Sequence, residues 1–421
     1  MNRTVVITGL GAICGRATTA STLFESLESG RSAIRTHPSF AQYGFPYSGC
    51  AHIDHELWRL LETAYPDPRL GPHARLALHA AGQALEASGF TPEDTSRAGL
   101  FVGSNKNTLT EHQLLALGRH FDVETGRVDL DDYLLHEGHD SASFLHRRQD
   151  MAAWSVGTRY GFRSTCCTHG DACAAGGIAI GTGFRHIRHG ELDAALVGAT
   201  EAMCSYVPML LFGALGALTA ESSDQPELLS RPFDRTRSGF VMGEGSAFMM
   251  LESKEHAERR GAPILATVMG FAKQCEAWRM TASAPDGSLY ARCIESALKD
   301  AGLAPEDIHH VNAHGTSTPQ NDGCEAAALK RVFGHRLSSL PVTSNKSALG
   351  HSLAASGALE AVLSVLSLQR QTLLPTLNFQ EPDGVTEGLD IVRVVRRHDM
   401  DNVLSLSFGF GGENCALVLG R

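Results

Sequence analysis

The chain has 421 residues, enough to bury a large core as two domains or as one duplicated unit. Its hydrophobic content of 43% and charged content of 19% are ordinary for a globular enzyme. The net charge of −10 argues against a nucleic-acid-binding protein, which would carry a basic excess.

Cysteine usage and the N-terminus indicate where the protein works. The ten cysteines follow no regular framework, which favours free thiols in a reducing compartment over disulfides. The N-terminus enters a strand-like run, Thr4–Thr8, without the basic and long apolar segments of a signal peptide. No run of about 18 apolar residues could span a bilayer. We therefore expect a cytoplasmic protein with no membrane and no nucleic-acid partner.

Strand-like runs alternate with segments of helical apolar spacing, such as 74–88 and 290–301. This alternation predicts an α/β architecture. The expected strands are Thr4–Thr8, Ala98–Val102, Ala194–Val197, Ala247–Leu251, Ile264–Met269, His310–Asn312, Val342–Ser344, Asn402–Ser407 and Ala416–Leu419.

One pattern occurs twice. Ala84–Asp94 resembles Ala297–Asp307, and each predicts a helix end, a glycine cap, a proline-led turn and then a strand. A strand that begins with glutamate closes each half of the chain. The two matches in the same order favour a duplication. The expected units are residues 1–255 and 256–421. Residues 105–160 fit neither copy, and we expect a surface excursion or an oligomer-facing segment there.

Cys173 precedes two alanines, two glycines and a small-residue helix, 178–187. The helix dipole stabilises a thiolate by roughly 0.3–2 kcal/mol, so we expect the pKa of this thiol to fall from about 8.5 to roughly 7.5. The same helix end offers backbone N–H groups to an oxyanion. The plainer alternative is a buried structural cysteine. Zinc binding with Cys166, Cys167 and His169 is a weaker one, because no Cys-x-x-Cys pair is present.

Two histidines follow in similar surroundings. His314 comes after a strand-like run, at the end of a strand where α/β sheets hold ligands. His351 follows Gly350 at an expected helix start, whose dipole disfavours the imidazolium. Two neutral imidazoles beside a thiol suit the stabilisation of an enolate or oxyanion, although a lone histidine is more often structural. We expect Lys346 to anchor the site together with Glu325, the alternative being a surface lysine.

Two glycine-rich stretches complete the candidates. Gly9-Leu-Gly11 after the first strand suggests dinucleotide binding, but Cys14 occupies the position of the third glycine. Gly409-Phe-Gly-Gly412 permits unusual backbone angles, and Phe410 could act as a mobile gate or pack in the core beside a turn.

Together these stretches resemble the β-ketoacyl-acyl-carrier-protein synthases, in the synthase I/II branch of the thiolase superfamily. The resemblance covers nearly the whole chain. It implies an α/β fold with a thiolase-like, duplicated five-layer αβαβα architecture. The matching motifs are Val6–Gly11, Arg231–Gly245, His314–Pro319, Lys346–His351 and Ser407–Asn414.

The resemblance implies a role for each matching residue. Cys173 would be the acylated nucleophile, and His314 and His351 would be the decarboxylation pair. Lys346 would support them, paired with Glu325. Thr316 and Thr318 would line the phosphopantetheine tunnel. Phe410 would be the gate of this tunnel, and its backbone N–H would join that of Cys173 in the oxyanion hole.

The implied reaction has two half-steps. An acyl group moves from a carrier-protein thioester to Cys173. Malonyl-carrier protein then loses CO2, and its enolate attacks the acyl group to give a 3-oxoacyl thioester two carbons longer. No metal or other cofactor is required. The implied partners are an acyl carrier protein and, in a homodimer or heterodimer, a ketosynthase homologue, in a type II polyketide, polyene or fatty-acid pathway.

Three stretches depart from the family pattern. Gly103–Thr108 is polar near the expected acyl pocket, Asp67–Arg75 has few basic residues, and Ala354–Gly357 reads Ala-Ala-Ser-Gly. Two alternatives remain. One is a non-catalytic, chain-length-factor-like partner subunit, which would usually lack the cysteine. The other is a thiolase-fold acyltransferase without decarboxylation, which would usually pair one histidine with a second cysteine.

Overall fold

The computed structural model describes residues 2–37, 40, 47, 49–91, 97–105, 111–137, 145–221 and 223–421. Residues 92–94 of the repeated pattern and residues 106–108 of the polar segment lie outside the described residues.

One sheet of eleven strands runs through the described part of the chain. Most of its strands are almost completely buried, because their side chains are apolar on both faces. In spatial order the strands are β14 (Asp390–Ile391), β12 (Pro341–Thr343), β11 (His310–Asn312), β16 (Asn402–Gly409), β17 (Glu413–Gly420), β10 (Ala266–Cys275), β1 (Val5–Cys14), β9 (Gly245–Ser253), β8 (Ala194–Glu201), β4 (Ala98–Gly103) and β7 (Cys166–His169).

The sheet repeats one pattern of strand directions. Outward from β1, β9 pairs antiparallel with β1 and β8 pairs antiparallel with β9. β4 then pairs parallel with β8, and β7 pairs parallel with β4. Outward from β10, β17 pairs antiparallel with β10 and β16 pairs antiparallel with β17. β11 then pairs parallel with β16, and β12 pairs parallel with β11. β1 and β10 pair with each other and join the two halves. We propose that the chain divides into units of residues 1–255 and 256–421, a division that this repeated order supports.

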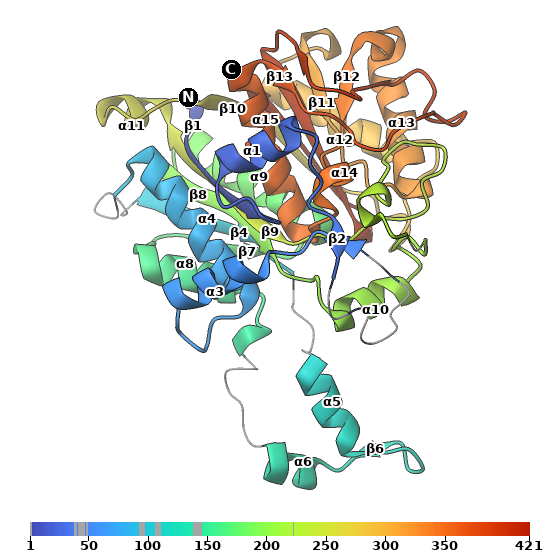
Figure 1. The fold of residues 1–421 in the computed structure, drawn as a ribbon. Coiled ribbons are helices and arrows are strands. Elements are labelled where there is room, and N and C mark those ends of the chain that lie inside the picture. The colour runs from blue at the N-terminus through green and yellow to red at the C-terminus, as the bar shows by residue number, and fades with distance from the viewer. Residues whose placement is uncertain are drawn as a thin grey trace.

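Helices lie in three layers around the two halves of the sheet (Figure 1). The buried face of α9 packs with that of α15 between the halves. α4 and α8 cover the outer face of the N-terminal half, and α12 and α13 cover that of the C-terminal half. The helices are α1 (Ala20–Glu28), α3 (His55–Ala64), α4 (Pro72–Ser88), α5 (Glu111–Arg119), α6 (Leu130–Glu137), α8 (Met151–Tyr160), α9 (Ala175–Arg188), α10 (Tyr206–Ala214), α11 (Lys254–Arg259), α12 (Ser288–Ala301), α13 (Pro319–Phe333), α14 (Lys346–Leu349) and α15 (Ser356–Arg370).

The repeated helix ends fold as their sequences predict. Gly89 caps α4 with φ 62° and Gly302 caps α12 with φ 69°, in the left-handed region that glycine adopts without a steric cost. Gly9 and Gly11 have a packing role, since a Cβ on either would lie within 2.1 Å of a backbone oxygen of α4. These glycines therefore let α4 approach β1 closely.

Two short pairs of strands and a projecting segment complete the description. β2 (Arg35–Thr36) pairs with β3 (Gly49–Cys50), and β13 (Thr372–Leu373) pairs with β15 (Arg396–Arg397). α5, the hairpin of β5 (Phe121–Asp122) and β6 (Arg127–Val128), and α6 project from the body (Figure 1). This projection lies within residues 105–160, where a surface excursion or an oligomer-facing segment was expected, and its position outside the body is compatible with either.

Candidate active site

One cavity of about 310 Å³ brings together the three residues that the sequence places far apart. Cys173, His314 and His351 all line it, and so do Thr316, Thr318 and Phe410. Cys173 comes from the turn before α9, His314 from the end of β11, and His351 from the loop after α14. The convergence expected from the sequence is therefore present in the structure.

A strained turn presents the Cys173 thiol. The turn η2 (Ala172–Ala174) leads into α9, and Ala172 has φ 48°, a conformation that costs a non-glycine residue about 1–3 kcal/mol. Burial raises the pKa of Cys173 to about 12, and the positive charge of Lys346 and the backbone N–H of Phe410 act in the opposite direction. The expected lowering of this pKa is wrong, because the cost of burying a thiolate exceeds the effect of the helix dipole.

The two imidazoles face each other in the cavity. Their rings meet edge to face, with centroids 5.3 Å apart and planes at 83°. Phe408 packs against His314 with centroids 5.9 Å apart, and Phe240 packs against His351 at 5.1 Å. Burial, followed by the charge of Lys346, holds the pKa of both histidines well below the usual value of 6.5. Both rings are therefore neutral at physiological pH, as the sequence predicts.

A serine orients His351. The Oγ of Ser356 lies 2.9 Å from Nδ1 of His351. Ser356 is the first residue of α15 and belongs to the Ala354–Gly357 stretch that departs from the family pattern. Because Nδ1 is engaged, Nε2 is the ring nitrogen of His351 left to act on a substrate.

Two carboxylates of α13 hold the loop that carries His314. Glu325 accepts hydrogen bonds from the backbone N–H groups of His314 and Gly315 at 2.7 and 2.8 Å. Asp322, one turn earlier, accepts those of Thr316 and Ser317 at 2.9 and 3.2 Å. Four consecutive N–H groups of the loop are therefore fixed by one face of one helix.

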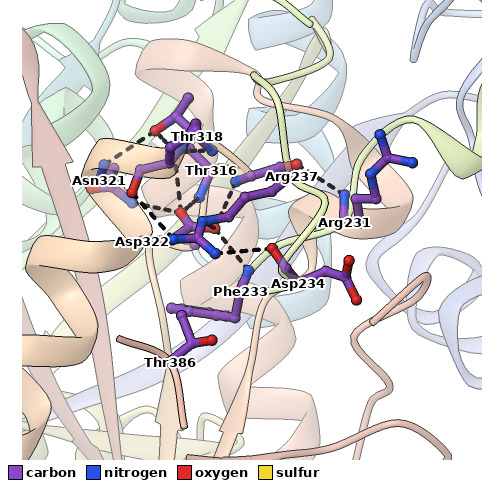
Figure 2. Close-up of polar contacts among 12 residues, drawn as sticks. Arg231, Phe233, Asp234, Arg237, Thr316, Thr318, Asn321, Asp322 and Thr386 are labelled. Carbon is purple, nitrogen blue, oxygen red and sulfur yellow. Dashed lines mark hydrogen bonds and ion pairs between the residues drawn. The ribbon is translucent and has the colours of Figure 1, made fainter. Parts of the chain in front are cut away.

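Asp322 also ties this loop to a second one (Figure 2). Its carboxylate accepts a hydrogen bond from the backbone N–H of Phe233 at 2.8 Å and lies 3.9 Å from the guanidinium of Arg237. Arg237 also forms an ion pair with Asp383 at 2.7 Å. Thr316 and Thr318, whose Oγ1 atoms lie 2.9 Å apart, are therefore presented to the cavity from a firmly held loop.

Lys346 is buried, not on the surface, and its partner differs from the expected one. Its ammonium forms an ion pair with Glu360 on α15, and both side chains are about 2% exposed. Glu325 was expected to be this partner, but its oxygens accept hydrogen bonds from the His314 loop and the direct ion pair is with Glu360. The charge of Lys346 still acts on Glu325, where it opposes the rise of the pKa to about 8 that burial causes. Burial raises the pKa of Glu360 to about 7, and the charge of Lys346 opposes this effect.

Phe410 lies beside the thiol. It begins the turn η7 (Phe410–Gly412) between β16 and β17. The backbone N–H groups of Phe410 and Cys173 both act on the Cys173 sulfur and lower its pKa. A Cβ on Gly409 would lie 3.1 Å from the Cys173 nitrogen, a tight contact that glycine avoids in this close approach. The two N–H groups thus point to one place in the cavity, where an oxyanion would be stabilised.

Several lining residues carry no signal in the sequence. Tyr290 stacks on Phe408 with centroids 3.6 Å apart, and its hydroxyl lies 2.8 Å from Ser283 Oγ. Arg279 and Met280 lie at the same cavity. Cys166 and Cys167 are on β7 and are not among its lining residues. Within the described residues, no group of three His, Cys, Asp or Glu side chains is placed to hold a metal ion, and no described helix is long and apolar enough to cross a membrane.

Comparison with known proteins agrees with this geometry. Residues 2–257 match the N-terminal domain of the beta-ketoacyl synthases and residues 265–380 match their C-terminal domain. The chain is 34% identical to 3-oxoacyl-[acyl-carrier-protein] synthase 2 of Coxiella burnetii, over 100% of this chain and 99% of that protein. It is 35% identical to the tetracenomycin polyketide synthase ketoacyl synthase alpha subunit of Streptomyces glaucescens, over 99% of this chain and 98% of that protein.

Two solved structures superpose over the full length of both chains. One is a type II polyketide acyl carrier protein in complex with its ketosynthase bound to the hexaketide, with a TM-score of 0.88 and 31% identity. The other is the ishigamide ketosynthase/chain length factor, with a TM-score of 0.86 and 31% identity.

These observations define a thiolase-like α/β fold around a cysteine and two histidines, as predicted. The chain belongs to the beta-ketoacyl synthase family. It is an acyltransferase of the ketosynthase class, whose members catalyse condensation in fatty-acid or type II polyketide synthesis.

Proposed function

We propose that this protein catalyses a decarboxylating Claisen condensation between an acyl group on Cys173 and malonyl-acyl-carrier protein. The observation that carries the proposal is the single cavity that holds one thiol, two neutral imidazoles and two converging N–H groups. Covalent storage of the acyl group divides a difficult condensation into two easier steps.

In the first step the Cys173 sulfur attacks the carrier-bound thioester. The carbonyl oxygen becomes negative in the tetrahedral intermediate, and the N–H groups of Cys173 and Phe410 stabilise it there. The carbon–sulfur bond to the carrier breaks, and the departing thiolate takes up the proton that the Cys173 thiol gives up. Since the pKa of Cys173 is raised to about 12, the thiol must lose its proton as the substrate arrives and is not stored as a thiolate.

In the second step the malonyl group occupies the position beside the two histidines. Its carbon–carbon bond to the carboxylate breaks, CO2 leaves, and the electron pair moves into an enolate whose oxygen accepts hydrogen bonds from His314 and His351. The enolate carbon attacks the acyl-Cys173 carbonyl. The Cys173 thiolate then leaves and takes a proton from solvent, which frees a 3-oxoacyl-carrier protein.

Lys346 acts through its charge. It lowers the pKa of Cys173 and keeps the pKa of both histidines low. Its ion pair with Glu360 fixes the ammonium behind the site. Thr316 and Thr318 line the path that we assign to the phosphopantetheine arm, and Phe410 is the side chain placed to gate it.

We assign the protein an acyl carrier protein and a second ketosynthase-like subunit as partners, in the cytoplasm. Two features support a dimer. β7 pairs only with β4 within the described residues and leaves one strand edge unpaired. The projecting segment of α5 and α6 exposes apolar side chains, among them Leu115, Val123 and Leu135. Light scattering should give twice the chain mass of 45.1 kDa, and an active monomer would exclude this assignment.

A polar neighbourhood near Cys173 supports a polyketide or polyene pathway. Asn105 donates a hydrogen bond of 2.8 Å to the buried carboxylate of Glu201, which itself raises the pKa of Cys173. Primary fatty-acid elongation is the nearest rival. A non-catalytic chain-length partner is disfavoured by the complete set of Cys173 and the two histidines, and a non-decarboxylating acyltransferase by the second histidine.

The direct test is turnover with purified components. Wild-type protein, an acyl-loaded carrier protein and malonyl-carrier protein should yield CO2 and a 3-oxoacyl-carrier protein two carbons longer, detected by mass spectrometry. Cys173→Ala should form no condensed product, and Cys166→Ala serves as the matched control. If wild-type protein releases CO2 without forming a condensed product with any acyl carrier, the proposal fails.

A further inference from the structure

A lysine joins the two turns that carry the oxyanion N–H groups. Lys273 lies on β10, and its ammonium forms ion pairs with Asp171 and, at 3.4 Å, with Glu413. Asp171 directly precedes the η2 turn that presents Cys173. Glu413 directly follows the η7 turn that begins with Phe410. We call Lys273, Asp171 and Glu413 the charge clamp, because they connect the start of one turn to the end of the other.

Asp171 holds the turn of the nucleophile in two ways. Its backbone carbonyl accepts a hydrogen bond from the N–H of Ala174 at 3.0 Å, which closes the turn around Cys173. One oxygen of its carboxylate pairs with Lys273, and Nδ1 of His169 lies 3.5 Å from the other oxygen. The hydrogen bond from His169, followed by that from Lys273, lowers the pKa of Asp171, although burial opposes this effect. The carboxylate is therefore charged at neutral pH.

Glu413 holds the turn of Phe410 from the other side. It pairs with Gly409 across the β16–β17 hairpin, and Gly409 comes directly before Phe410. A Cβ on Gly409 would lie 3.1 Å from the backbone oxygen of Asp171 and 3.1 Å from the nitrogen of Cys173. The two turns are thus in close contact. A small movement of either turn changes the distance between the N–H groups of Cys173 and Phe410.

The charge clamp opposes a repulsion between like charges. Asp171 and Glu413 share one ammonium, and without it their negative charges would push the two turns apart. The ammonium is partly exposed, and an ion pair of this kind adds little to the stability of a fold. Its effect on position is more important, because a shift of about 1 Å in a catalytic group can lower a rate by about 10²-fold.

We propose that Lys273, Asp171 and Glu413 are positioning residues that set the separation of the two oxyanion N–H groups. The inference rests on the proposed function, since these N–H groups matter only if a thioester is attacked at this site. None of the three is among the described residues that line the cavity, so they act through the two turns. The expected signature is a lower maximal rate in steps that form an oxyanion, with an unchanged thiol.

The test compares two reactions of the Cys173 thiol in the full-length protein. Acetyl-N-acetylcysteamine is attacked at its carbonyl carbon, so its reaction with Cys173 passes through an oxyanion. Iodoacetamide is attacked at a saturated carbon, where the sulfur displaces iodide, the thiol proton passes to solvent and no oxyanion forms. Both reactions are followed in single-turnover experiments by mass spectrometry of the Cys173 peptide.

Lys273→Met should lower the maximal rate of acetylation by about tenfold or more. The half-saturating thioester concentration should change by less than about threefold, and alkylation should stay within about twofold of wild type. Lys273→Arg keeps the positive charge and should restore most of the acetylation rate. Lys254→Met is the matched control, because Lys254 also pairs with a carboxylate, that of Glu258 at 3.8 Å, on α11.

The members of the charge clamp should also depend on one another. Asp171→Asn combined with Lys273→Met leaves no pair of carboxylates to repel, so the double variant should acetylate no more slowly than Lys273→Met alone. If the two effects multiply, the residues act separately and the proposal is wrong. If Lys273→Met does not fold, Glu413→Gln takes its place and should slow acetylation without slowing alkylation, and equal effects on both overturn the proposal.

The remaining outcomes are decisive as well. If Lys273→Met slows acetylation and alkylation equally, the thiol itself has changed and the proposal is overturned. If wild-type protein is acetylated and forms condensed product, but Lys273→Met acetylates at the wild-type rate, this inference fails and the proposed function stands. If no thioester donor acylates wild-type protein, both fail.

Discussion

The imidazole rings of His314 and His351 meet edge to face, with their centroids 5.3 Å apart and their planes at 83°. Each ring is backed by a phenylalanine, Phe408 behind His314 and Phe240 behind His351. The pair is therefore held as a unit, and both rings face one small volume next to Cys173.

Loss of either imidazole should separate the two half-reactions. His314→Ala or His351→Ala should leave acylation of Cys173 largely intact, because the oxyanion N–H groups come from other segments. Release of CO2 from malonyl-carrier protein should fall by about 10²–10³-fold, the usual effect of removing one donor to a developing oxyanion. The measurement is labelled CO2 release, with the exposed His189→Ala as control. Unchanged release would remove the histidines from the mechanism.

Ser356 should tune His351 without being essential. Ser356→Ala removes the partner of Nδ1, so the ring loses its fixed orientation and tautomer. We expect CO2 release to slow by about tenfold, the effect of roughly one hydrogen bond, with no change in acylation. Ser356→Thr keeps a hydroxyl and should retain more of the activity than alanine. Equal rates for wild type and Ser356→Ala would show that the contact has no role.

The ion pair of Lys346 and Glu360 should behave as a buried pair. Lys346→Met leaves a carboxyl group without its partner and should cost about 3–5 kcal/mol in the free energy of unfolding. Lys346→Met combined with Glu360→Gln removes both charges and should be less destabilised than the single variant. Urea denaturation of the two variants measures the difference. If the double variant is the less stable one, the two side chains do not act as a pair.

The two site histidines should stay neutral well below pH 6.5. Folding lowers their pKa, so protons bind the unfolded chain more readily. Each histidine therefore contributes stability that is present above about pH 6.5 and is lost as the pH falls. In protein labelled with 15N-histidine, the resonances missing from His314→Gln and His351→Gln should not shift between pH 8 and 6. Titration of either resonance near 6.5 would contradict the burial argument.

Much of the fold follows from local patterns. Each long buried strand is a run of β-branched and other apolar residues, so Thr4–Thr8, Ala98–Val102 and their counterparts predict the sheet. The sequence did not predict β7, because Cys166–His169 is a short, polar edge strand that is only partly buried. Cys173, His314 and His351 were predictable because the motif around each one is short and contiguous, whereas Tyr290 and Met280 line the same cavity without such a motif.

The sequence does not reveal how deeply a side chain is buried or which two side chains form a pair. The pKa of Cys173 depends on how completely the thiol is removed from water, which the helix start alone does not reveal. Glu360 pairs with Lys346 across two helices, and nothing in its spacing distinguishes it from Glu325. Ser356 was visible only as a departure from the family pattern, and its contact with His351 needed the coordinates.

Intact-mass analysis after incubation with a panel of acyl-carrier proteins tests the central claim most directly. With at least one acyl-carrier protein, wild-type protein should gain the mass of one acyl group, and peptide mapping should place that group on Cys173. Cys173→Ala should gain nothing. An acyl group found on Cys166 or Cys167, or continued labelling of Cys173→Ala, would contradict the account.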